Sequence, residues 1–214
     1  MMSRSVQIVA AVYLCFFTFF LGLYMMGEHG DAVLAVNARR HLGLDLVMPV
    51  LTHLGDGWFF SIAVLGLLLV RWRSGLVLLA LGLLQLFMSW LLKRVIFKGT
   101  PRPKTFFSDQ GISLDFISGV DVHSYNAFPS GHTMTAFAIA TFFFLYSRKL
   151  WVGMVALLLA MVTGFSRIYL LQHFLIDVVI GSLVGVLLAA TVYLLFRSSL
   201  TRENPSAALR SEHT

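Results

Sequence analysis

Charged residues and cysteines are both scarce in this sequence. Asp, Glu, Lys and Arg make up only 12% of its 214 residues, whereas 58% are hydrophobic. The mean hydropathy of +0.83 is far above what a soluble domain of this size can bury in one core, so we exclude a soluble fold. The single cysteine, Cys15, permits no intrachain disulfide. The sequence contains no glycine-rich phosphate loop and no zinc-type spacing of Cys and His, so neither kind of site is indicated.

Six long apolar runs account for this composition. A helix needs roughly 20 apolar residues to cross the hydrocarbon core of a bilayer, and several runs are shorter, so their boundaries are approximate. The first run follows Arg4, but no small-residue cleavage site comes after it, and we interpret it as a retained span rather than a signal peptide. We therefore predict an all-α bundle of six transmembrane helices, within Val6–Met26, Trp58–Val70, Gly75–Leu92, Thr133–Ser147, Leu150–Phe165 and Phe174–Phe196.

Two segments between these runs have a different character. Gly30–Leu54 mixes apolar residues with a few charged ones, which predicts an amphipathic helix in the membrane interface, with an ordinary loop as the alternative. Lys93–Phe128, between the third and fourth predicted spans, contains prolines and glycines that argue against a continuous helix. We expect one integral-membrane domain over residues 1–197 and a polar, cytoplasmic tail over 198–214.

Lysine and arginine are divided equally between the two sides of the predicted bundle. Eight of the 16 lie in short turns and at the termini, and eight lie on the other side, mostly in the two loops that carry polar motifs. Because phosphate binding would explain the second group, we use the first to orient the chain. We predict an integral protein of the plasma (inner) membrane, with cytoplasmic termini and motifs that face the periplasm or exterior.

Arg167, His173 and Asp177 form an ionisable cluster at the last apolar run. Such groups are costly beside a membrane span unless the protein uses them, so they indicate a functional site. His173 and Asp177 are four residues apart and share one face of a helix. The carboxylate can then orient one ring nitrogen and leave the other free to attack, which makes His173 a candidate nucleophile.

A second polar string, Pro-Ser-Gly-His, precedes the fourth predicted span. A helix N-terminus offers unpaired backbone N–H groups, and Gly131 lets an anion approach them closely. Ser130 can cap this helix and donate to the same anion. His132 is a candidate for protonating a leaving oxygen. Arg102 and Arg167 supply guanidinium groups for the remaining phosphate oxygens.

These strings resemble the three signature blocks of the type 2 phosphatidic acid phosphatases, membrane lipid phosphatases related to vanadium haloperoxidases. The first block corresponds to Arg102-Pro103, the second to residues 129–132, and the third to Ser166-Arg167 with His173 and Asp177. The second and third blocks match in full, and the resemblance covers about Lys93 to Asp177. It implies a phosphomonoesterase or diphosphatase that needs no metal and acts through a phosphohistidine.

The resemblance also implies a role for each matching residue. His173 corresponds to the nucleophile, Asp177 to its orienting partner, and His132 to the general acid for the leaving group. The remaining matching positions correspond to residues that hold the phosphoryl group, namely Ser130, Gly131, Arg102 and Arg167.

The first block departs from the family pattern in the spacing of its lysine. The family usually leaves six residues between a lysine and the Arg-Pro pair, and that register here falls on Val95. Lys93 leaves eight intervening residues and Arg94 leaves seven. An added residue or two at the helix end would bring either one back to the phosphate, so we predict Lys93 first and Arg94 second.

Three functions fit these residues. The leading one is hydrolysis of a phosphate or diphosphate from a membrane lipid, such as phosphatidylglycerol phosphate, phosphatidate or undecaprenyl diphosphate. The alternatives are phosphate removal from, or transfer to, a lipid or lipid A, and lipid-phosphate binding or transport. We expect the lipid substrate and the bilayer as partners, and no metal, other cofactor, nucleic acid or required protein partner. The other histidines in loops and at helix ends we assign to surface or packing roles: His29, His41, His53 and His123.

Overall fold

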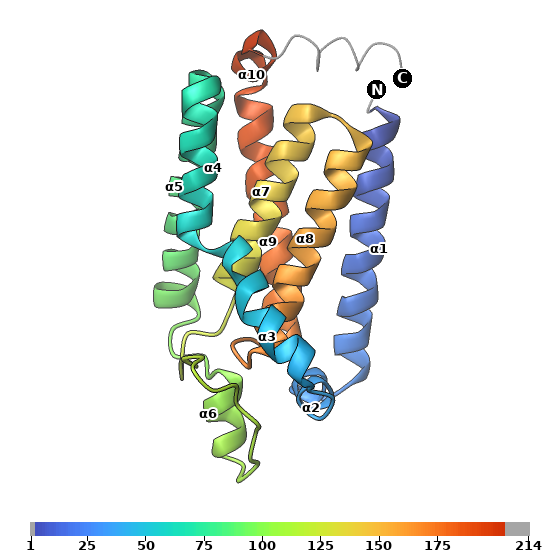
Figure 1. Cartoon of the computed structure of the whole chain (residues 1–214), viewed down its shortest axis with the longest axis vertical. Helices are drawn as coiled ribbons and strands as arrows, with labels where there is room; N and C mark the ends of the chain where they lie inside the picture. The colour runs from blue at the N-terminus through green and yellow to red at the C-terminus, as the bar shows by residue number, and fades with distance from the viewer. Residues whose placement is uncertain (1–2, 204–214) are drawn as a thin grey trace.

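The structure, a computed structural model, describes residues 3–203, and these form helices with no strand among them (Figure 1). The predicted all-α fold class is confirmed, and each of the six predicted apolar runs is helical over most of its length, the third run continuing from α5 into η2. In chain order the elements are α1 (Arg4–Met26), α2 (Asp31–Asn37), α3 (Leu42–Leu51), the 3-10 turn η1 (Thr52–Gly55), α4 (Gly57–Val70), α5 (Trp72–Trp90), the π-helical turn η2 (Leu91–Ile96), α6 (Pro103–Ser108), α7 (Gly131–Ser147), α8 (Leu150–Tyr169), α9 (Leu175–Leu195) and α10 (Arg197–Glu203).

Four of the described helices are each long and apolar enough to cross a membrane: α1, α5 continued by η2, α8 and α9. α4 has only 14 residues, but it follows α3 and η1 across a 51° bend, and this bent pair qualifies together as a fifth crossing. α7 has 17 residues and lies in the middle of the bundle (Figure 1). The protein is therefore an integral membrane protein.

The segment predicted to lie in the membrane interface is helical but broken. α2 and α3 are separate helices, and α3 leads through η1 into α4. The Arg40 guanidinium forms two hydrogen bonds, of 3.1 and 3.0 Å, with the carboxylate of Asp45, and the Tyr169 hydroxyl donates to the same carboxylate at 2.6 Å. These bonds attach α3 to the end of α8, two residues after Arg167.

α7 packs against both α8 and α9, and small residues let these helices approach one another. A Cβ atom added at Gly181 of α9 would lie 2.8 Å from the carbonyl oxygen of Ser130, and one added at Gly185 would overlap the backbone of Met134. The backbone N–H of Ser130 donates to the carbonyl oxygen of Asp177 at 3.0 Å. Two segments that are far apart in the sequence are thereby held side by side.

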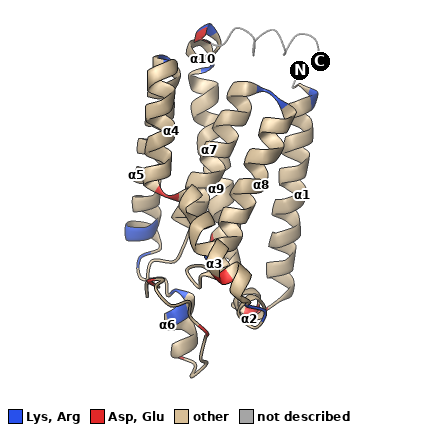
Figure 2. Cartoon of the chain, viewed as in Figure 1, with Lys and Arg blue, Asp and Glu red and all other residues tan. Residues whose placement is uncertain are grey.

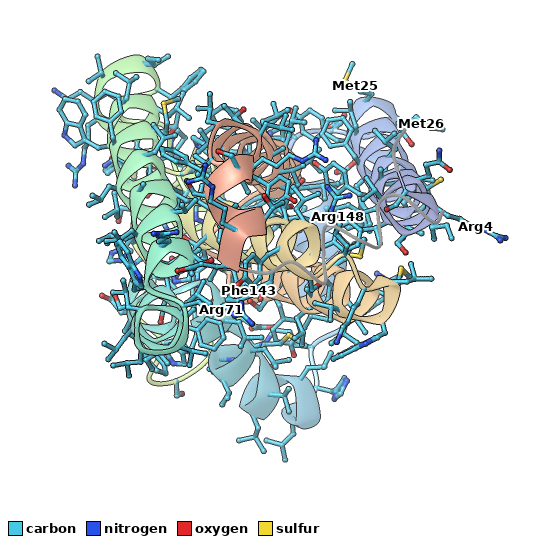
Figure 3. All side chains as sticks on the ribbon, turned by 90° about the horizontal axis from the view of Figure 1, so that it is seen from above. Arg4, Met25, Met26, Arg71, Phe143 and Arg148 are labelled. Carbon is cyan, nitrogen blue, oxygen red and sulfur yellow. The ribbon has the colours of Figure 1, made fainter. Side chains whose placement is uncertain are left out.

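The described ends of the chain lie at one end of the bundle, and the long loop that contains α6 lies at the other (Figure 1). Charged residues gather near these two ends, with long uncharged stretches of helix between them (Figure 2). Arg4, Arg71 and Arg148, from three different parts of the chain, all lie at the end near the termini (Figure 3). The predicted group of cations in the turns and at the termini also includes Arg210, which lies outside the described residues.

Only the first part of the predicted polar tail is described, because residues 204–214 lie outside the described range. Up to Glu203 the chain is helical, as α10. The Glu203 carboxylate accepts hydrogen bonds from the backbone N–H groups of Arg73 (3.0 Å) and Ser74 (2.9 Å), and from the Ser74 hydroxyl (2.8 Å). It therefore satisfies donors at the start of α5 that have no partner within that helix.

Candidate active site

A cavity of about 430 Å³ lies at the end of the bundle opposite the termini, between η1, η2, the long loop and the ends of α7 and α8. It brings together residues from four parts of the sequence, including five predicted site residues. Its lining comprises Pro49, Thr52, His53, Asp56, Lys93, Arg102, Gly119, Val120, Asp121, His123, His132, Arg167, Leu170, Gln172 and His173.

His173 and Asp177 are paired and almost fully buried, with exposures of 1% and 2%. The Nδ1 atom of His173 lies 3.3 Å from Oδ2 of Asp177, and this carboxylate oxygen also accepts the backbone N–H of Phe174 at 2.9 Å. The second bond fixes the carboxylate at the start of α9, where an acidic residue is favoured. Since Nδ1 faces the carboxylate, Nε2 is the ring nitrogen left for chemistry.

The electrostatic surroundings favour a neutral His173. Burial, followed by the positive charges of Lys93, Arg102 and Arg167, holds the pKa of His173 well below its ordinary value. A neutral imidazole has a free lone pair, which a nucleophile requires.

The start of α7 lies beside this pair. Ser130 is fully buried and caps α7: its Oγ accepts from the backbone N–H of Thr133 at 3.4 Å and from the Thr133 hydroxyl at 2.8 Å. A Cβ atom added at Gly131 would lie 3.7 Å from Nζ of Lys93, so the lysine ammonium lies close to the first residue of the helix. A positive helix end and an ammonium group thus meet at one place, which suits an anion.

Two buried arginines lie on the same cavity, and both are held by hydrogen bonds. Arg102 donates from NH1 to Oε1 of Gln172 at 2.6 Å and from Nε to the Tyr125 carbonyl at 3.1 Å. Arg167 donates from NH1 to Oγ1 of Thr52 at 2.6 Å. The buried Nε of Arg167 has no hydrogen-bond partner among the described residues. These guanidinium groups are fixed in place with donor capacity to spare, which is what binding of a tetrahedral anion needs.

The structure separates the two candidates for the first-block lysine. Lys93 lies on the cavity wall, whereas Arg94 is exposed and is not part of the lining. Both belong to η2, a π-helical turn, which accommodates more residues per turn than an α-helix. The wider turn accommodates extra residues between Lys93 and the Arg-Pro pair, as the longer spacing in this sequence requires.

The sequence analysis missed several lining residues, of which Asp56, Thr52 and Gln172 make direct contacts with predicted site residues. Oδ1 of Asp56 lies 2.5 Å from Nε2 of His132. His53 and His123, which we had assigned to surface or packing roles, also line the cavity. The signal for Asp56 was present in the sequence, since it is a lone carboxylate between two glycines that interrupts an apolar region.

Comparisons with known proteins show which family the chain resembles. The pattern of the PAP2 superfamily matches residues 73–200. The chain is 32% identical over 158 residues to phosphatidylglycerophosphatase B from Bacillus subtilis (strain 168). This match covers 69% of this chain and 67% of that protein. The chain is also 44% identical over 70 residues to lipid A 1-phosphatase from Porphyromonas gingivalis. This match covers 32% of this chain but only 16% of that protein.

A solved structure extends the match over most of the chain. The structure resembles that of the first transmembrane PAP2 type phosphatidylglycerolphosphate phosphatase from Bacillus subtilis, with a TM-score of 0.64 and 28% identity, over 88% of this chain and 96% of that one. Fold and cavity together define an integral membrane protein with a histidine-containing polar site at one end of a helical bundle. The chain belongs to the PAP2 superfamily.

Proposed function

We propose that the protein is a lipid phosphatase of PAP2 type that hydrolyses a phosphate or diphosphate group of a membrane lipid through a phosphohistidine. The observation that carries this proposal is the convergence of two histidines and three cations on one cavity: His173, His132, Lys93, Arg102 and Arg167. Attraction of an anion alone does not require a buried histidine backed by a carboxylate, whereas nucleophilic catalysis does.

Each residue has a defined task in the proposed reaction. Nε2 of His173 attacks phosphorus, the bond between phosphorus and the leaving oxygen breaks, and His132 gives that oxygen a proton. In the second half, His132 takes a proton from a water molecule whose oxygen bonds to phosphorus. The bond between phosphorus and His173 then breaks and inorganic phosphate leaves. Lys93, Arg102, Arg167 and the start of α7 stabilise the charge on the equatorial oxygens in both halves.

We further propose six crossings, with the bent α3–α4 pair and α7 completing the four long helices, and a site that faces the periplasm or exterior. The cations at the end near the termini support this orientation, because positive residues favour the cytoplasmic side. In a Cys15→Ala background, a cysteine at the exposed Ser108 should react with an impermeant maleimide in cells whose inner membrane is intact. A cysteine at the exposed Ser198 should react only after the membrane is opened, and the reverse pattern would overturn the orientation.

The polar cavity does not select one lipid, and relatives supply the candidates. Phosphatidylglycerol phosphate is the first choice because two relatives matched over most of the chain are named for this activity. Phosphatidate and undecaprenyl diphosphate are further candidates. Lipid A is the alternative substrate, because one relative, matched over 70 residues, is named lipid A 1-phosphatase. Transfer of the phosphoryl group to a lipid acceptor instead of water is a second alternative reaction.

A phosphate-release panel tests the proposal. Detergent-purified protein should release inorganic phosphate from at least one of the four lipids in excess chelator, and His173→Ala should abolish release. His41→Ala is the matched control, because its side chain is exposed and lies outside the cavity. Labelled phosphate that appears in a second lipid would indicate phosphotransfer. Lipid movement without hydrolysis, unchanged in His132→Ala and His173→Ala, would establish transport instead.

A further inference from the structure

Asp56 contacts the proposed general acid but lies outside all three signature blocks. It is the N-cap residue of α4, a position where an Asp side chain commonly accepts a backbone N–H of the first turn. Here the side chain makes no such capping bond. Its Oδ1 instead lies 2.5 Å from Nε2 of His132, and its Oδ2 lies 2.5 Å from Nδ1 of His53 and accepts from Nε1 of Trp58 at 3.2 Å. Both carboxylate oxygens are therefore engaged by aromatic rings.

The backbone around Asp56 is adapted to this contact. A Cβ atom added at Gly55 would lie 2.5 Å from the carbonyl oxygen of His132, so only glycine lets η1 approach the first turn of α7 this closely. The bend between η1 and α4 then directs Asp56 at the imidazole. Thr52, at the other end of η1, accepts the hydrogen bond from Arg167. One short segment, residues 52–56, thus supports two residues of the cavity.

Charge explains why His132 needs such a partner. The cations that share its cavity come from three elements: Lys93 from η2, Arg102 from the long loop and Arg167 from α8. Burial of the ring, followed by the charges of Arg167 and Lys93, disfavours a protonated imidazole, yet a general acid must carry a proton when the substrate is bound. Asp56 is the carboxylate in contact with this imidazole, and His53 and Trp58 hold it in place.

We propose that Asp56 is a positioning residue for His132, which holds the proton on Nε2 and leaves Nδ1 to deliver the proton to the leaving oxygen. This inference rests on the proposed function. During the first half-reaction the Nδ1 proton moves to the leaving oxygen as its bond to phosphorus breaks, while the Nε2 proton stays with the Asp56 contact. Water returns a proton to Nδ1 in the second half. The two carboxylate–histidine pairs therefore use different ring nitrogens. Asp177 contacts Nδ1 of His173 and leaves Nε2 free, whereas Asp56 contacts Nε2 of His132 and leaves Nδ1 free.

The basicity of the leaving group provides a specific test. A lipid alkoxide is strongly basic and needs a proton as it leaves, whereas p-nitrophenolate is weakly basic and leaves without one. Asp56→Asn removes the charge and keeps the size, and it disturbs no cap. We expect it to lower kcat/KM, which reports only the steps up to departure of the leaving group, by roughly 100-fold or more with a lipid monophosphate from the panel, the loss typical for general acid catalysis. With p-nitrophenyl phosphate we expect a loss of less than about 3-fold, because general acid catalysis then contributes little.

The matched control is Asp45→Asn, which removes a hydrogen-bonded carboxylate of α3 that lies outside the cavity. It should lower both activities by the same small factor. Equal losses of both activities in Asp56→Asn would overturn the positioning role while the proposed function stands. If the parent protein releases phosphate from no lipid, the proposed function fails and this inference fails with it.

A spectroscopic measurement checks the assignment without relying on activity. In protein labelled with ¹⁵N at histidine, His132→Gln identifies the His132 ring signals by their loss. The parent should carry a proton on Nε2 of His132, and Asp56→Asn should change that ring's tautomer or protonation. Identical His132 signals in parent and variant would overturn the inference, whatever the activity. A single species in size-exclusion chromatography establishes that the variant is folded.

Discussion

Arg167 donates a 2.6 Å hydrogen bond to the hydroxyl of Thr52, which lies 115 positions earlier in the sequence. The arginine belongs to a signature block, and the threonine belongs to a 3-10 turn that no block includes. Because Arg167 is only 6% exposed, this bond is important for the direction in which the guanidinium points. The proposed phosphate binding by Arg167 therefore depends on Thr52, which lies outside the matched residues 73–200, as well as on residues inside them.

Replacement of Thr52 by Val should weaken binding of the phosphoryl group. The change keeps the shape of the side chain but removes the acceptor of a charged donor, an interaction worth about 1.5–3 kcal/mol. Loss of that energy from the transition state corresponds to roughly 10- to 100-fold in kcat/KM. Phosphate-release kinetics and the inhibition constant for vanadate measure the effect. Thr163→Val is the control, since this buried threonine bonds to the backbone of its own helix; an equal loss there would contradict the prediction.

Lys93 and Arg94 provide a matched pair of cations on one π-helical turn. Lys93→Met should lower kcat by about 100- to 1,000-fold, the usual cost of removing one donor that stabilises developing negative charge. Arg94→Met should retain most of the activity, because Arg94 is exposed and is not part of the lining. Steady-state assays on the two variants under identical conditions make the comparison. A larger loss in Arg94→Met would reverse the assignment.

The lowered pKa of His173 predicts a pH dependence of stability. As pH falls below the ordinary value of 6.5, the unfolded chain takes up a proton at this residue, but the folded protein resists protonation because of burial and neighbouring cations. The unfolded state then binds more protons, so this residue's contribution is present above 6.5 and is lost as pH falls towards the folded pKa. Thermal unfolding between about pH 5 and pH 8 should show a steeper decline for the parent than for His173→Asn. Parallel curves would refute the prediction.

Glu203→Ala should destabilise the protein without changing its chemistry. The carboxylate satisfies three donors at the start of α5, and loss of a capping interaction costs typically about 1 kcal/mol. The midpoint of thermal unfolding in detergent should fall, whereas kcat and KM should stay at the parent values. Arg202→Ala serves as the control, because this side chain is exposed on the same helix. A change in KM would show that α10 affects the site.

The sequence by itself determined where most of the helices lie and which residues are candidates for the site. Its six apolar runs are helical where helices were expected. No water in the bilayer core can bond to the backbone, so an apolar run satisfies its N–H and C=O groups within a helix. His173 and Asp177 are paired as expected, but the predicted shared helix face is wrong: His173 precedes α9, so the turn at its N-cap residue Phe174 brings the two side chains together. The Pro-Ser-Gly-His string likewise marks the start of α7, which Ser130 caps. These features need only short stretches of chain.

Only the tertiary structure decided which distant residues meet. Lys93 enters the cavity and Arg94 does not because the helix end winds into a π turn, and a spacing rule does not reveal that winding. Asp56 contacts His132 because Gly55 lets η1 approach α7 closely, a relation that depends on how the bent α3–α4 pair packs. The physical reason is that helix formation is local, whereas the contacts that complete a site depend on how whole helices pack together.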